Sequence, residues 1–218
     1  MDVILGIEKF PPLSKFDINQ GKIPEIALKI ADFLRSIFLL SNTLLHGNNF
    51  IIYCSEHFQS PPKGLIIVFH GKLLRYLAPD ERGILFLLLK IQKIITGEGG
   101  KRQEKKESLK FENMLKAQST PGIFLKRGSS REIWDMNLPI GNQYINVGNL
   151  NQEYPTLNTW NELESKLNSA TVLVFSQIGH FLISPPNVTS IYDFVEDSWK
   201  AKFYESELIS YIQAKITE

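Results

Sequence analysis

The sequence alternates short runs of β-branched and aromatic residues with longer segments whose apolar residues recur at three- and four-residue spacing. NFIIYC at 49–54 and GLIIVFHG at 64–71 are the clearest short runs. Their near-continuous apolarity is typical of strands in the middle of a sheet, which are buried on both faces. Such strands interleaved with helices predict an α/β fold, built on a mostly parallel sheet with helices on both faces.

Four segments carry the periodicity of helices with one buried face. The first is predicted to begin near Pro24 and to end by Asn42, with its apolar residues on one helical face. The second is DERGILFLLLKIQKII, which ends before GEGG. In the third, TWNELESKLNS, Thr159 and Glu162 have the spacing of a capping box. The fourth, ESELISYIQAKITE, is expected to pack as a helix at the end of the sequence.

Three further strand-like runs, at 122–127, 143–148 and 171–184, complete a prediction of five or six strands. Residues 97–110, GEGGKRQEKKESLK, combine glycine with mixed charge and almost no apolar residue, which is typical of a flexible insertion. The segments on either side of it are alike in character. Residues 1–218 are therefore expected to form a single domain.

The composition favours an ordinary globular protein and leaves its partner open. There are 24 lysines and arginines against 23 acidic residues, and the net charge of +1 by itself predicts neither nucleic-acid binding nor a membrane surface. The most hydrophobic helix carries Lys29, Asp32 and Arg35, and charges at bilayer depth are costly, so no membrane span is expected. The single cysteine, Cys54, indicates an inert core side chain in a reducing, cytoplasmic setting.

Several common catalytic motifs are missing from the sequence. It contains no phosphate-binding P-loop, no Gly-x-Gly-x-x-Gly fingerprint, no His-Glu-x-x-His and no Gly-x-Ser-x-Gly elbow. The four histidines stand far apart, so no metal site is expected. His180 follows Gly179 in a strand-like run, where a hydrogen-bonded histidine at a strand end is favoured over a ligand contact.

The stretch LAPDERG at 77–83 has the features of a helix start. Pro79 suits the first helical position, where its missing N–H is no loss. Asp80 and Glu81 would lie in the first turn, where carboxylates complement the positive end of the helix dipole. Its three adjacent charges leave a second interpretation open, in which the helix start borders a site for a charged ligand.

The stretch QSTPGI at 118–123 has the features of a turn followed by a strand. Proline followed by glycine suits the central positions of a type II turn. The polar residues before the proline could also receive a polar ligand. Lys126 and Arg127 follow closely and could contact phosphates.

Taken together, PPKGLIIVFHGKLLRYLAPDERGILFLLLKIQKI, the charged spacer and QSTPGIFLKR resemble the archaeal tRNA (pseudouridine-54 N1)-methyltransferase family of the SPOUT superfamily. The likeness covers about residues 60–127. It implies an α/β chain with a C-terminal trefoil knot that works as a homodimer. It also implies transfer of a methyl group from S-adenosylmethionine to N1 of a pseudouridine in the T-loop of tRNA.

The resemblance assigns residues to the two sides of this reaction. It implies catalytic roles for Asp80, Glu81 and Arg82. It implies RNA contacts from Gln118, Ser119, Thr120, Lys126 and Arg127. It implies cofactor contacts from Ile145, Ile178, Gly179, Tyr204, Ser206, Glu207 and Leu208.

Three family segments differ in this chain. A GRLD-type segment corresponds to IPEIALK, the knot segment GDHIG corresponds to FSQIG at 175–179, and the terminal LSPLELHANHC corresponds to YESELISYIQA. Phe175 stands where the family has a glycine that lets backbone approach the cofactor. Two functions therefore stay open: a divergent methyltransferase, or a SPOUT-like RNA-binding or partner subunit that has lost cofactor binding. A heteromeric partner that supplies the missing groups is compatible with both.

Overall fold

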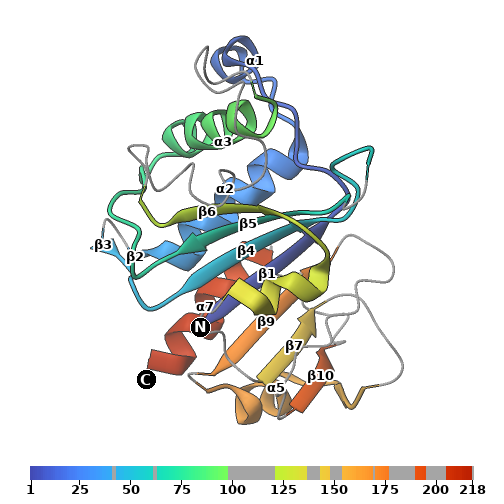
Figure 1. Ribbon diagram of the computed structural model, residues 1–218. Helices are drawn as coiled ribbons and strands as arrows, with labels where there is room; N and C mark the ends of the chain where they lie inside the picture. Colours follow the sequence, from blue (N-terminus) through green and yellow to red (C-terminus); the bar gives the residue numbers. More distant parts are fainter. Residues whose placement is uncertain are drawn as a thin grey trace.

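The computed structural model describes residues 1–40, 43–60, 63–97, 121–136, 143–147, 154–168, 170–176, 190–194 and 205–217. These residues form an α/β fold in which helices cover an eight-stranded sheet (Figure 1). The predicted flexible insertion at 97–110 lies outside the described residues apart from Gly97.

Most strand pairs of this sheet are parallel, as predicted. The strand order is β6-β5-β4-β1-β9-β7-β10-β8, and β5 is the strand that runs antiparallel to both of its described neighbours. The strands are β1 (Asp2–Ile7), β4 (Asn49–Cys54), β5 (Leu65–His70), β6 (Ile123–Arg127), β7 (Gln143–Val147), β8 (Thr156–Leu157), β9 (Thr171–Ser176) and β10 (Ser190–Phe194). A separate antiparallel hairpin joins β2 (Leu39–Leu40) and β3 (Thr43–Leu44).

The strand β1 lies at the centre of the sheet, between β4 and β9. All six of its residues are buried, and its register sets Leu5 opposite Phe175. From β1 the chain adds β4, β5 and β6 outward on one side of the sheet. On the other side, the step from β9 to β10 leads outward in the opposite direction. The direction of winding therefore reverses between β1 and β9. In open α/β sheets, ligands commonly bind at the carboxyl ends of strands at such a reversal.

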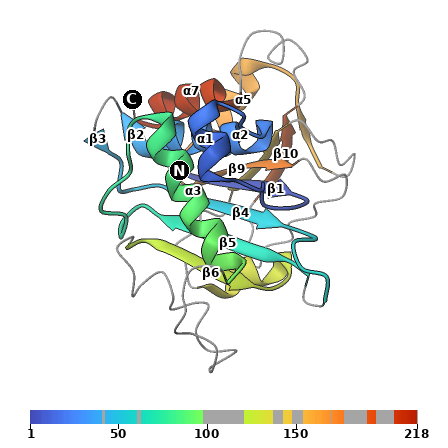
Figure 2. The same ribbon diagram turned by 90° about the horizontal axis from the view of Figure 1, so that it is seen from above.

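The helices gather on one face of the sheet within the described residues, as two perpendicular views show (Figures 1 and 2). Side chains from each of the α-helices belong to one core cluster with the sheet residues of that face. On the other face, Ile133 of a short 3-10 helix packs against Ile4 and Ile51. The helices are α1 (Lys15–Gln20), α2 (Glu25–Phe38), α3 (Glu81–Ile95), η1 (Ser130–Met136), α5 (Trp160–Lys166) and α7 (Glu205–Thr217). Helices were expected on both faces. Within the described residues, the second face is covered only by the short helix η1.

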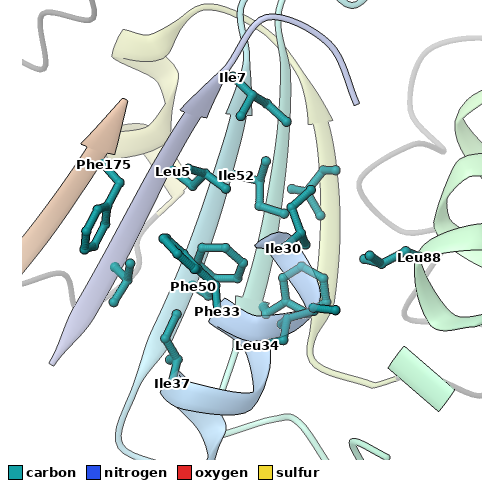
Figure 3. Packing of buried hydrophobic residues seen from close by; sticks show 14 of the residues in the cluster. Leu5, Ile7, Ile30, Phe33, Leu34, Ile37, Phe50, Ile52, Leu88 and Phe175 are labelled. Atoms are coloured by element: carbon teal, nitrogen blue, oxygen red, sulfur yellow. The ribbon is translucent and has the colours of Figure 1, made fainter. Parts of the chain in front are cut away.

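The apolar face of α2 forms the centre of the core. Its residues Ile30, Phe33, Leu34 and Ile37 follow helical spacing and point at the sheet (Figure 3). The ring of Phe33 contacts that of Phe175 edge-on, with 5.0 Å between centroids. Each such buried side chain contributes about 1.5–3 kcal/mol by leaving water. This packing holds α2 across β1, β4 and β9.

The predicted boundaries of most apolar segments are close to the observed ones; for the strand expected at 171–184, β9 begins at Thr171 as predicted and residues 177–184 lie outside the described residues. The strands expected at 49–54, 64–71, 122–127 and 143–148 are present within one residue. The capping box at the start of α5 is confirmed. The strands β1, β8 and β10 and the helix α1 are not among the predicted elements.

The first long helix ends at Phe38, earlier than the predicted Asn42. Leu39 takes extended backbone angles, with φ −117° and ψ 120°, and pairs with Leu44 in the β2–β3 hairpin. The expected trefoil knot concerns the C-terminal part of the chain, of which residues 177–189 and 195–204 lie outside the described residues. No helix of the described segments has the length and apolar character needed to cross a membrane.

Candidate functional site

LAPDERG starts α3, as predicted, but Pro79 precedes the N-cap and is not the first helical residue, which is Glu81. Asp80 is the N-cap, and its Oδ1 accepts the backbone N–H of Gly83 at 2.7 Å. Glu81 lies in the first turn and its side chain is exposed. Arg82 donates from Nη2 to Oδ1 of Asn19 at 2.9 Å, which ties α3 to α1. Asp80 and Arg82 therefore have structural contacts, and Glu81 remains exposed to solvent.

A pocket of about 450 Å³ lies over the outer face of α2, beside the loop that leads to this helix start. A stripe of α2 with helical spacing lines it, together with Pro79 and two serines of α7. The lining residues are Asp32, Arg35, Ser36, Leu39, Pro79, Ser206 and Ser210. We call this pocket the α2 groove.

The chemistry of the α2 groove is polar and carries both charge signs. Arg35 and Asp32 form an exposed ion pair, with 3.7 Å between Nη1 and Oδ1. Beside the groove, Lys29 of α2 forms an ion pair with Glu205 at the start of α7. The groove therefore offers a carboxylate, a guanidinium and hydroxyl groups to a ligand of mixed charge.

A second pocket, of about 530 Å³, lies where the chain leaves β5 and enters β6. His70 at the end of β5 donates its backbone N–H to the carbonyl of Gly122 at 2.7 Å. The lining residues are His46, Lys72, Leu73, Leu74, Arg75, Pro121, Gly122 and Phe124. The fold thus brings the segment before PDER next to the glycine of QSTPGI.

Gly122 has the positive φ that the predicted type II turn requires at its second central residue. Its φ is +91°. A Cβ at this position would lie 2.5 Å from the backbone nitrogen of Leu74. Glycine is therefore required both by the backbone conformation and by the close approach of the neighbouring loop.

The cations predicted to contact phosphate, Lys126 and Arg127, form contacts within the protein. Lys126 forms an ion pair with Glu132 of η1, with 3.2 Å between Nζ and Oε2. Arg127 donates to Ser60, and its guanidinium lies 4.3 Å from the centroid of the Phe58 ring. Both lie at the far end of β6 from Gly122 and line neither pocket described above.

The residues predicted to contact the cofactor are only partly brought together. Ser206 lines the α2 groove, and Glu207 is exposed on the next position of α7. Ile145 and Leu208 are fully buried in the core. The remaining predicted site residues lie outside the described residues: Gln118, Ser119, Thr120, Ile178, Gly179 and Tyr204.

Cys54 is placed as its simpler sequence interpretation predicts, and His180 lies outside the described residues. Cys54 is fully buried, and burial raises the pKa of its thiol, so the thiol is held in its unreactive form. Among the described residues, no group of three or more histidine, cysteine or acidic side chains is arranged to hold a metal ion.

Two sets of pocket residues were not predicted. In the sequence, Asp32 and Arg35 are charges that argue against a membrane span. Together with Ser36 they also follow helical spacing on the polar face of α2. Arg75 lies between the buried Leu74 and Leu77, and Lys72 lies two residues before Leu74, so the spacing of these leucines was the available signal. A scan of the sequence against protein-family models and a search of curated proteins both find no match.

Proposed function

We propose that this chain is an S-adenosylmethionine-dependent tRNA methyltransferase that methylates N1 of a pseudouridine in the T-loop. The observation that carries the proposal is the α2 groove, in which Pro79 and Ser206 line one pocket. The resemblance assigns the segment of Pro79 to the substrate and that of Ser206 to the cofactor. Methyl transfer requires acceptor and donor to be held together in line, so a shared pocket is the expected arrangement.

The donor set of the α2 groove fits S-adenosylmethionine. The carboxylate of Asp32 can face a cationic group of the cofactor, the guanidinium of Arg35 can bind its carboxylate, and Ser206 can bond its hydroxyl groups. The volume of about 450 Å³ is within the usual range for small-ligand pockets. The ring of Phe175 lies in the core against Phe33 and not in this groove.

When bound, the cofactor supplies a methyl group on a positively charged sulfur. The task of the chain is to position the pseudouridine and to accept the proton that leaves its N1. Glu81 is the better acceptor of the two carboxylates in PDER, because Asp80 already accepts the N–H of Gly83. Arg82 has guanidinium donors beyond the one bound to Asn19, and these can hold an anionic group of the RNA.

Calorimetric titration with S-adenosylmethionine tests the cofactor half of the proposal. We expect saturable heat with the unchanged chain and much weaker binding by Asp32→Asn and Arg35→Gln. Lys22→Gln is a matched control, because Lys22 is exposed and lines neither pocket. The absence of both heat and thermal stabilisation at millimolar cofactor would exclude a methyltransferase activity that uses S-adenosylmethionine for this chain.

Mass analysis of tRNA incubated with the chain and the cofactor tests the reaction itself. The expected product is a gain of one methyl group on a pseudouridine of the T-loop. Glu81→Gln is expected to slow this gain by about a hundredfold or more with little change in cofactor binding. Asp80→Asn keeps an N-cap acceptor and serves as the control.

A non-catalytic RNA-binding or partner subunit is the second candidate. The burial of Ile145 and Leu208 favours it, because two side chains assigned to the cofactor are in the core. Binding of tRNA without methyl gain would support this alternative. The resemblance also implies a homodimer, which a size measurement in solution would test. Methyl gain only after a second protein is added would indicate a heteromeric partner. We place either activity in the cytoplasm.

A further inference from the structure

The loop between β5 and α3 has buried anchors and exposed polar and aromatic side chains. Leu74 and Leu77 are 1% and 5% exposed and belong to the core. Tyr76 between them is 72% exposed, although intermediate burial is usual for tyrosine. Lys72, Leu73 and Arg75 are exposed as well. We call residues 72–76 the basic loop.

The base of the basic loop is held by backbone hydrogen bonds. The N–H of Leu74 donates to the carbonyl of His70 at 2.9 Å, and the N–H of Gly71 donates to Asn48 at 3.0 Å. The Nδ1 of His46 lies 2.8 Å from the carbonyl oxygen of Gly71 and donates to it. The exposed side chains therefore project from a fixed backbone, which lowers the entropy lost on binding a ligand.

The charged side chains that line the pocket beside the basic loop are positive. Lys72 and Arg75 line the pocket of about 530 Å³ together with His46, and its described lining contains no carboxylate. Within the described segments, neither Lys72 nor Arg75 forms an ion pair. Two cations beside an exposed aromatic ring match the alternating phosphates and bases of a nucleic-acid strand.

We propose that the basic loop binds single-stranded RNA, with phosphates on Lys72 and Arg75 and one base stacked on the ring of Tyr76. The choice of RNA rests on the proposed function, since a T-loop presents unpaired bases. An apolar protein partner would leave both cations without counter-charges. The loop and the α2 groove are neighbours along the chain, because Pro79 follows three residues after Tyr76.

Fluorescence anisotropy of a labelled oligouridylate of about ten nucleotides tests this site without cofactor. Tyr76→Ala is expected to weaken binding by about tenfold or more, and Tyr76→Phe is expected to keep it, because stacking needs the ring and not the hydroxyl. The double variant Lys72→Gln, Arg75→Gln is expected to lower the slope of log affinity against log salt by about 1.4, since each lost phosphate contact removes about 0.7.

The matched control is Lys15→Gln, Phe16→Ala, which removes an exposed lysine and a 66% exposed aromatic ring from α1. Its RNA affinity should equal that of the unchanged chain. Equal affinities of the Tyr76→Ala variant and the unchanged chain, or binding of anionic lipid vesicles in place of RNA, would overturn the proposal.

The two proposals can fail separately. The loop proposal alone is overturned if the chain binds S-adenosylmethionine and methylates tRNA while substitutions in the basic loop leave its RNA affinity unchanged. A chain whose RNA affinity depends on Tyr76 but which takes up no cofactor overturns the methyltransferase and keeps the loop.

Discussion

Replacing Gly122 with alanine tests how firmly the basic loop is held against β6. The backbone of Gly122, at φ +91°, lies where an L-residue loses about 1–3 kcal/mol. The added Cβ would lie 2.5 Å from the nitrogen of Leu74 and 2.7 Å from the carbonyl carbon of Leu73. Because both atoms belong to the backbone, they cannot rotate away, and overpacking adds about 1–3 kcal/mol.

The reduced freedom of the unfolded alanine variant returns about 0.4–1 kcal/mol, so the expected net loss is about 1–6 kcal/mol. Gly21 is the matched control, since it has φ +68° but no atom within 4 Å of an added Cβ. Gly21→Ala should cost only the left-handed backbone term of about 1–2 kcal/mol, less the same return from the unfolded chain. The difference between the two variants isolates the steric clash.

Urea unfolding followed by far-ultraviolet circular dichroism measures both variants under one condition. Equal slopes against urea would show that the free energies of unfolding can be compared directly. The loss in Gly122→Ala should exceed that in Gly21→Ala by at least about 1 kcal/mol. Equal losses in the two variants would refute the reasoning, because the loop would then yield freely.

Three further results are expected. Asp80→Ala removes the N-cap of α3 and should lower the free energy of unfolding by about 1 kcal/mol in urea titration, whereas Asp80→Asn should have little effect. Cys54, buried with a raised pKa, should react with a thiol reagent only as fast as the chain opens, and rapid labelling in native buffer would contradict this. The backbone N–H of Ser129 and then the Lys126 ammonium lower the pKa of Glu132. The ionised Glu132 should therefore contribute its full stabilisation above the ordinary glutamate pKa. This contribution should be lost as the pH falls through the lowered pKa of the folded protein. Glu132→Gln should remove that part of the acid dependence of thermal unfolding.

The elements that could be predicted carry their own local signals. The stripe containing Ile30, Phe33 and Ile37 needs no distant partner to indicate a buried helix face. The helix start at Asp80 is also local, because the cap bonds a backbone N–H three residues away. Capping and periodicity act within a few residues, so the boundaries of α3 and α5 could be located from sequence.

The missing elements depend on distant residues. β1 is stabilised by pairing with strands that contain Phe50 and Phe175. Neither the length of β1 nor the residues next to it in the sequence indicate these partners. The direction of β5 had a signal, since the connection from Cys54 to Leu65 is shorter than the dozen or more residues that a parallel crossover needs. The two pockets could not be predicted, because each joins segments that are brought together only by tertiary packing.

The position of β1 also shapes how the chain reaches its native state. Val3 pairs with Phe50 on one side, which is available early in synthesis, but its other partner, Leu173, is made much later. Until then, one edge of the central strand offers unpaired N–H and C=O groups to other chains. Pairing between such distant segments also raises the contact order, which slows folding. Newly made chains of this protein are therefore expected to fold late and to be prone to aggregation until β9 joins the sheet.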